Sequence, residues 1–338
     1  MKTIDEIYWL RFYGAIAVFS FHLIDHVERN YLEHTALDLA RIPFVLGTPI
    51  FVFISIFLFS ARYENEVPQN FLTSRLKYVM LPYFIYGTIY ATAVYFQHAS
   101  QGEPIGYVQN LTEYLLFAGW HGYFLVVAMQ FYVLFWAYKR FGLHHWMRSG
   151  PWLVPASLIS IGWWGYCHWQ GVEPPGYLHW IAPIGWIYLF FLALLVVRHY
   201  PDIRTHPWLR RLSDPTWLVL YVGALLILGL RGDLEYSSKE PWVIPLFILA
   251  LAWALPRLSN LKATPAVKTI NEASFGIYLA HPIFFSGVDV VGAHVAIPLW
   301  LYVIVMAVAG LGGSILLNQL VNRYDWSAML LGRRLRVA

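Results

Sequence analysis

The sequence predicts an all-α integral membrane protein, built as a polytopic bundle of about ten transmembrane helices with both termini in the cytoplasm. Hydrophobic residues make up 59% of the 338 residues, and charged residues only 12%. A soluble domain carries about 25% charged residues. Apolar segments of nearly the 20 residues that a bilayer requires also recur along the chain. We therefore expect one membrane domain over residues 1–338, without a separate soluble catalytic domain.

Ten apolar segments are predicted to cross the membrane. Several begin at or near a proline, which is tolerated at the first helical position because its missing N–H would have no partner there. The predicted spans are 8–27, 43–60, 78–97, 119–138, 151–169, 180–198, 215–231, 241–256, 274–291 and 297–320.

The distribution of basic residues predicts the orientation, because cytoplasmic loops are enriched in Lys and Arg. With the N-terminus inside, all but four of the 23 Lys and Arg residues fall on the cytoplasmic side. The exceptions are Arg29, Arg41, Arg231 and Lys239. Losing one span would scramble this alternation, so the pattern favours ten spans with both termini in the cytoplasm. We expect a multi-pass protein of the bacterial cytoplasmic (inner) membrane.

Charge and cysteine content exclude several classes of function. The net charge of +4 is explained by the cytoplasmic excess of basic residues, so no nucleic-acid partner is expected. Cys167 is the only cysteine, which excludes an intrachain disulfide and a cysteine-rich metal site. No metal-binding or phosphate-binding motif is present either. We expect no metal cofactor.

The first predicted span carries Arg11 and His22 within an otherwise apolar segment. Eleven residues are almost three helical turns, so both side chains project from one face, roughly 16 Å apart along the axis. Gly14, Ala15 and Val18 occupy the same stripe. Because ionisable residues inside a membrane are costly, they are functional candidates by default. This stripe suggests a lined path through the membrane.

His22 is followed at three residues by Asp25 and at four by His26. These spacings place side chains on one helical face, so Asp25 could fix the tautomer of His22. An imidazole oriented by a carboxylate is the arrangement of a general base. The alternative is that Asp25 and His26 are simply the helix end entering water. Arg11 is either a snorkelling boundary arginine or an interior guanidinium that binds a phosphate or carboxylate.

Two further groups of polar residues accompany the third and fourth spans. Arg75 and Lys77 precede the third span and are either topology signals or ligands for an anion entering from the cytoplasm. Tyr123 and Gln130 lie seven residues apart on one face of the fourth span. An intramembrane glutamine most often hydrogen-bonds a neighbouring helix, so a structural role is favoured for Gln130.

The ninth span carries Ser274, Tyr278 and His281 at positions i, i+4 and i+7. This polar stripe ends at Pro282, and a polar stripe with a proline break is typical of helices that line a cavity. We expect these three residues to line a substrate path. The alternative for His281 is a satisfied core histidine.

The sequence resembles the membrane acyltransferase family 3, bacterial polytopic enzymes that O-acylate carbohydrates. The resemblance covers nearly the whole chain. It is carried by Arg11-x10-His22, by FVFISIFLF followed by FLTSRLKYVMLPY, by HGYFLVVAMQFYVLF and by SFGIYLAHPIFF. The YFLxxxxQFY form in the fourth span is most similar to the branch associated with exopolysaccharide O-acetylation and O-succinylation.

The resemblance implies roles for particular residues. His22 matches the family's essential histidine, Arg11 its paired arginine that engages the acyl-CoA donor, and Arg75 its basic residue before the third span. Two positions depart from the pattern, because many members have Gly at the position of Ile56 and Glu at the position of Gln130. We therefore assign no proton-transfer role to Gln130.

The implied function is transfer of an acetyl or succinyl group from cytoplasmic acyl-CoA to a hydroxyl of a cell-surface or exported carbohydrate or glycolipid. His22 acts either as the base or as an acyl carrier, and both routes remain open. Membrane lipid, acyl-CoA and the glycan acceptor are the expected partners. The alternatives are a polysaccharide or solute transporter and a catalytically inactive membrane scaffold. The absence of an inverted repeat and the match to the acyltransferase motifs argue against transport.

Overall fold

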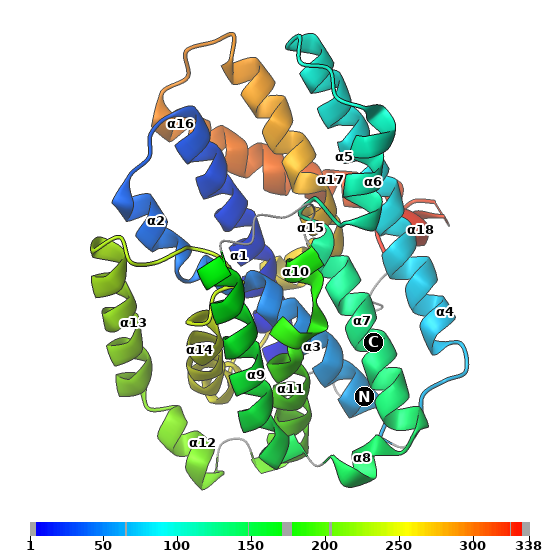
Figure 1. Cartoon of the computed structure of the whole chain (residues 1–338), viewed down its shortest axis with the longest axis vertical. Coiled ribbons are helices and arrows are strands. Elements are labelled where there is room, and N and C mark those ends of the chain that lie inside the picture. Colours follow the sequence, from blue (N-terminus) through cyan, green and yellow to red (C-terminus); the bar gives the residue numbers. More distant parts are fainter. Residues whose placement is uncertain are drawn as a thin grey trace. The chain divides into compact units, whose positions relative to one another are not determined.

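The structure, a computed structural model, describes residues 5–64, 66–147, 149–170, 178–202, 205–324 and 326–332. These residues form helices and connecting turns, and no strand occurs among them (Figure 1). The all-α prediction is thereby confirmed.

The chain forms two compact units, each described here by itself. The first unit comprises residues 1–54, 198–324 and 335–338, and the second comprises 55–197 and 325–334. The helices that fall mainly in the first unit are α1 (Asp5–Asn30), α2 (Thr35–Arg41), η1 (Phe44–Leu46), η4 (Tyr200–Asp202), α12 (Pro207–Leu212), α13 (Pro215–Leu230), α14 (Val243–Leu258), α15 (Pro265–Gly292), α16 (Leu299–Ala307), the π-helical segment η5 (Val308–Gly312) and α17 (Gly313–Val321). One helix, α3 (Gly47–Arg62), begins in the first unit and ends in the second.

The second unit contains the middle of the chain. Its helices are α4 (Phe71–Arg75), the π-helical segment η2 (Leu76–Met80), α5 (Leu81–Ser100), α6 (Tyr107–Leu116), α7 (Tyr123–Arg140), α8 (Leu143–Trp146), α9 (Ser149–Gln170), α10 (Leu178–Ile181), η3 (Pro183–Gly185), α11 (Ile187–His199) and α18 (Ser327–Leu330). The amide of Asn110 donates to the carbonyl of Ala91 at 2.6 Å, and the hydroxyl of Tyr83 donates to the carbonyls of Tyr114 and Leu115. These side-chain hydrogen bonds join α5 to α6.

The chain is a multi-pass membrane protein by the length and apolarity of its helices. Within the described residues, five helical segments are long and apolar enough to cross a bilayer: Asp5–Asn30, Thr35–Arg62, Phe71–Ser100, Pro265–Gly292 and Leu299–Val321. Pro215–Leu230 and Val243–Leu258 are shorter apolar helices. Other predicted spans correspond to helices that do not meet this criterion, such as α11, which has only 13 residues. The count of ten spans and the cytoplasmic termini stay predictions.

Helix α15 differs from its predicted span at both its start and its proline. It begins at Pro265, nine residues before the predicted start, because Thr264 caps it by accepting a hydrogen bond from the backbone N–H of Val267 at 3.3 Å. A search for long apolar segments misses this first part of the helix, because it contains several polar residues. The helix then continues through Pro282 to Gly292, so the proline break expected from the sequence is not present.

The region between the first two predicted spans also differs from its prediction. The predicted spans 8–27 and 43–60 leave a connection on the outer side between them. Instead α1 continues to Asn30, and α2 follows it from Thr35, capped by the imidazole of His34, which accepts a hydrogen bond from the N–H of Ala36. The extra turn of α1 carries Glu28 and Asn30, and α2 ends at Arg41; these three residues contact the candidate site described below.

Helices α1 and α15 lie side by side and run in the same direction. Near their starts, Asn271 donates to the carbonyl of Tyr8 at 2.7 Å. Further along both helices, the rings of His22 and His281 lie 5.3 Å apart, and His26 pairs with Asp289. The first helix and a late helix of the chain, far apart in sequence, therefore pack against each other.

Glycines permit the closest approaches around this helix pair. A Cβ on Gly47 would lie 2.6 Å from the side chain of Val18 in α1. A Cβ on Gly310, in the π-helical segment η5, would lie 2.5 Å from Phe285 and 2.6 Å from Phe19. Gly312 is the natural contrast, since nothing lies within 4 Å of its Cβ position.

We expect Gly310→Ala to destabilise the protein by about 1–3 kcal/mol, because overpacking forces core rings off their preferred positions. Gly312→Ala is expected to leave stability unchanged or slightly raised. Thermal unfolding of both variants in the same detergent measures this difference. Equal midpoints for the two variants would contradict the close packing of η5 against Phe19 and Phe285.

Glu240 lies in the connection between α13 and α14 and is buried. Burial is the main cause that raises the pKa of this carboxyl from 4.5 to about 8, and the neighbouring Glu235 adds to the effect while Lys239 opposes it. As the pH rises, Glu240 therefore keeps its proton to a higher pH in the native state than in the unfolded chain. Stability should fall as the pH rises from about 4.5 to about 8, with a slope of at most about 1.4 kcal/mol per pH unit.

Glu240→Gln should remove this slope, because the amide does not titrate. The exposed Glu33→Gln serves as the matched control and should keep it. The measurement is the unfolding midpoint of each variant across this pH range.

Candidate active site

The candidate site in the first unit begins with His22 and Asp25 on α1. Their spacing of three residues brings the imidazole Nδ1 within 3.4 Å of a carboxylate oxygen of Asp25. Both side chains are partly exposed, at 31% and 29%. The predicted pairing of these two residues is therefore present, with the imidazole still accessible to a small molecule.

Arg41 is a member of this site that the sequence reasoning missed. Its guanidinium lies 2.7 Å from the second oxygen of Asp25 and also pairs with Glu28. The same group lies over the ring of Phe21 at 5.4 Å, an additional cation–π attraction. Asp25 is thus shared between His22 and Arg41, with Arg41 the nearer partner.

His281 of α15 lies next to His22 and is fully buried. The two imidazole rings are 5.3 Å apart and inclined by 36°. The Nδ1 of His281 donates to the carbonyl of Ile277 at 2.7 Å, because a carbonyl can only accept, so its Nε2 is the nitrogen that can accept a proton. Phe19 and Phe285 pack against the same ring. The two imidazole rings are therefore neighbours, and apolar side chains pack against the ring of His281.

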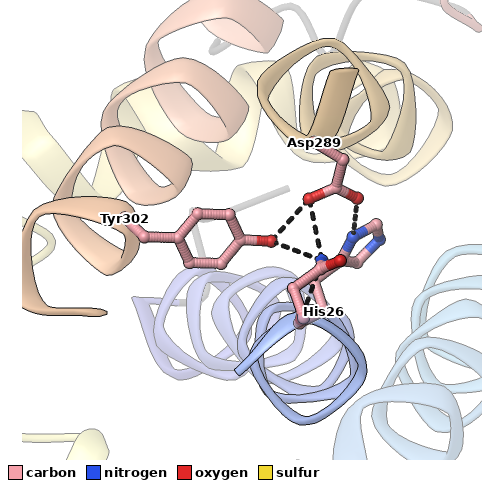
Figure 2. Close-up of polar contacts among 4 residues, drawn as sticks. His26, Asp289 and Tyr302 are labelled. Atoms are coloured by element: carbon pink, nitrogen blue, oxygen red, sulfur yellow. Dashed lines mark hydrogen bonds and ion pairs between the residues drawn. The ribbon is translucent and has the colours of Figure 1, made fainter. Parts of the chain in front are cut away.

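A second imidazole–carboxylate pair lies one helical turn further along α1. The Nδ1 of His26 is 2.6 Å from a carboxylate oxygen of Asp289 in α15. The other oxygen of Asp289 accepts from the hydroxyl of Tyr302 in α16 at 2.5 Å and from the amide of Asn30 at 3.0 Å. Figure 2 shows His26 and Tyr302 converging on Asp289 from different helices. These pairings could not be predicted from sequence, because periodicity relates residues of one helix only.

The other site residues predicted in the first unit lie on the same two helices. Arg11 is half-buried on α1, which continues without a break to His22, so their eleven-residue spacing is helical throughout. Ser274 and Tyr278 are buried on α15. Ser274 donates to the carbonyl of Asn271 in its own helix, which is a local bond and not a contact with another helix.

The predicted basic residues of the second unit have different surroundings. The guanidinium of Arg75 lies within 6 Å of three aromatic rings, at 4.7 Å from Phe59, 5.1 Å from Phe71 and 5.9 Å from Tyr132. Lys77 is exposed, and its ammonium lies 5.6 Å from the ring of Tyr78. Arg75 is therefore enclosed by aromatic residues, whereas Lys77 is open to solvent or to lipid headgroups.

The predicted pair on α7 is also in the second unit. Tyr123 is buried at the start of the helix, with its ring 6.2 Å from that of Trp180. The side-chain oxygen of Gln130 is buried and has no hydrogen-bond partner among the residues that the structure describes. The sequence favours an interhelical hydrogen bond for Gln130, and within the described chain its side-chain oxygen makes none.

Together, these observations define a polytopic helical membrane protein with a histidine–carboxylate site between its first and its late helices. The model of the acyltransferase domain family, acyltransferase 3, matches residues 4–319. The chain belongs to this family of acyltransferases, and the resemblance inferred from the motifs is confirmed.

Individual relatives are similar over most of their length. YfiQ of Bacillus subtilis, provisionally named a membrane-bound acyltransferase, is 25% identical over 98% of this chain and 94% of its own. A Staphylococcus aureus protein is 26% identical over 84% of this chain and 83% of its own. A Staphylococcus epidermidis protein is 25% identical over 82% and 80%. Both staphylococcal proteins are provisionally named poly-β-1,6-N-acetyl-D-glucosamine export proteins. No solved structure gives a significant match.

Proposed function

We propose that the protein is an O-acyltransferase that moves an acetyl or succinyl group from cytoplasmic acyl-CoA to a hydroxyl of an exported or cell-surface carbohydrate. Membership of the acyltransferase family supports the reaction class. The observation that carries the proposal is the partly exposed His22, which lies close to both the Asp25 carboxylate and the His281 ring.

In this proposal His22 handles the acyl group, and Asp25 orients its ring. As a base, His22 takes the proton of the acceptor hydroxyl while the oxygen attacks the thioester carbon. As an acyl carrier, its nitrogen attacks that carbon first, and the thiolate of CoA leaves. In both routes the C–S bond breaks, and one proton moves from the hydroxyl to the departing sulfur.

The cations named from sequence are the proposed contacts of the donor. Arg11, near the start of α1, and Arg75 and Lys77, near the start of α4–η2–α5, would bind the phosphates of acyl-CoA. Lys77 is the exposed member of this set. We propose Ser274, Tyr278 and His281 as residues that line the acceptor path in the first unit, and Tyr123 and Gln130 as lining residues of the second unit.

Glycan export is the second candidate, because two relatives carry the name of poly-β-1,6-N-acetyl-D-glucosamine export proteins. Export predicts passage of the glycan across a membrane without consumption of acyl-CoA. Acyl transfer predicts a covalent product, with one CoA released for each ester formed.

An assay in proteoliposomes separates these candidates. The purified protein is supplied with radiolabelled acetyl-CoA or succinyl-CoA and a β-1,6-linked N-acetylglucosamine oligosaccharide. We expect radiolabelled oligosaccharide and equimolar free CoA with one of the two donors, and mass spectrometry of the glycan identifies the acyl group. Glycan flux without release of CoA would favour export and overturn the transferase proposal.

A further inference from the structure

The second imidazole–carboxylate pair, His26 and Asp289, has the geometry of a proton-accepting dyad. The proton of the His26 Nδ1 faces the Asp289 oxygen at 2.6 Å, because an ionised carboxylate can only accept. The lone pair of the ring is therefore on Nε2, as it is in the general base of a catalytic triad. By comparison, the Nδ1 of His22 lies 3.4 Å from Asp25. His26 is the more firmly oriented of the two imidazoles.

Three side chains form hydrogen bonds with the carboxylate of Asp289. Besides His26, it accepts from Tyr302 at 2.5 Å and from Asn30 at 3.0 Å. Asn30 also donates to the Tyr302 hydroxyl at 3.0 Å, so the residues around the carboxylate are connected to one another. Such a network fixes the carboxylate and stabilises its charge. Figure 2 shows this convergence at the end of α1.

The carboxylate beside His22, in contrast, is engaged elsewhere. Arg41 lies 2.7 Å from Asp25, nearer than His22 does. The two dyads therefore differ in kind. His22 has a carboxylate shared with a cation, whereas His26 has a carboxylate whose other partners among the described residues are the neutral donors Asn30 and Tyr302. A carboxylate of the second kind stabilises a protonated imidazole better, which is what a base requires after it has taken a proton.

The position of His26 also suits an acceptor. His22 and His26 are four residues apart on one face of α1, about 6 Å along the axis. His26 is nearer to Asn30, the end of α1 that the sequence places toward the outer face. Its side chain is 12% exposed and that of Asp289 is 22% exposed, so neither is sealed within the core.

We propose that His26 is a second catalytic residue, the general base that activates the acceptor hydroxyl, with Asp289 as its positioning residue. This inference rests on the proposed acyltransferase function. The His26 Nε2 takes the hydroxyl proton while the oxygen forms a bond to the acyl carbon. In the route where His22 carries the acyl group, the adduct then collapses and its bond to the nitrogen of the acylated His22 breaks. That atom leaves with the electron pair, and the proton held by His26 is delivered to it.

A change of nucleophile tests this division of labour in the purified full-length protein. Hydroxylamine attacks acyl groups without a base, whereas a sugar hydroxyl requires one. We expect His26→Gln to lower transfer to the N-acetylglucosamine oligosaccharide about 100-fold or more, with hydroxamate formation kept within about twofold. The exposed His294→Gln is the matched control and should keep both activities.

Asp289→Asn provides the second variant, because its amide oxygen can still accept from Tyr302. We expect a smaller loss, about 10-fold, confined again to the oligosaccharide and accompanied by an altered pH–rate profile. Equal losses with both nucleophiles would show that the cluster only clamps α1, α15 and α16 together and would overturn the proposal, as would full transfer to the oligosaccharide by His26→Gln. If the wild-type protein consumes no acyl-CoA with either nucleophile, the proposed function itself fails.

Discussion

Replacement of His22 by glutamine is expected to lower acyl transfer to the oligosaccharide by about 1,000-fold or more. Transfer to hydroxylamine should fall to the same extent where His22 carries the acyl group, and it should be kept where His22 acts only as the base, because hydroxylamine needs no base. Glutamine keeps a polar side chain of similar length but can neither take a proton nor carry an acyl group. The loss should appear in kcat, because the donor cations are untouched, and stability should change little because His22 is partly exposed. Release of CoA from radiolabelled acyl-CoA measures the effect.

His145→Gln is the control for this substitution, since His145 is an exposed histidine in the second unit. It should retain wild-type activity. Full acyl transfer by a correctly folded His22→Gln preparation would show that the scheme is wrong. The same assay separates the routes: exchange of labelled CoA into acyl-CoA without acceptor is expected only if His22 carries the acyl group.

The second large effect is expected at Arg41. Its side chain is 14% exposed and neutralises both Asp25 and Glu28. Arg41→Gln leaves these partly buried carboxylates without a cation, which we expect to cost about 2 kcal/mol of stability. Activity should fall about 10-fold to 100-fold, because Asp25 loses the partner that fixes its orientation beside His22. Thermal unfolding and CoA release measure the two effects.

A double variant separates stability from positioning at Arg41. Glu28→Gln combined with Arg41→Gln removes one of the uncompensated charges, so we expect it to recover part of the lost stability while activity stays low. Arg29→Gln, which removes an exposed arginine from the same helix, should change neither. Recovery of full activity by the double variant would contradict a positioning role for Arg41.

Much of the helical architecture was predictable from sequence because apolar length is a local property. The predicted span 215–231 corresponds to α13 and 297–320 to α16–η5–α17, each within two residues at either end. Prediction failed at the start of α15, where residues 265–273 include four polar residues and are nevertheless helical, because a capping threonine and Pro265 begin the helix there. Apolarity alone does not report such a signal.

The candidate site was predictable only where its members belong to one helix. The pairing of His22 with Asp25 follows from their spacing, and Arg11 shares the same continuous helix. Arg41 was counted only as an exception to the charge rule, although it pairs with Asp25. Asp289 and Tyr302 were missed because their contacts with α1 join residues more than 260 positions apart, which no periodicity within one segment encodes.

The separation between α1 and α15 has a consequence for how the protein is made. Arg41 follows Glu28 by 13 residues, so the carboxylates near the end of α1 meet their cation almost as soon as they leave the ribosome. His26 and Asp289 are 263 residues apart, which at ordinary synthesis rates is a delay of roughly 10–50 s. Until α15 has been made, the polar residues at the end of α1 must be accommodated by the insertion machinery or by lipid headgroups. Truncation before α15 should therefore produce a chain that membrane proteases remove.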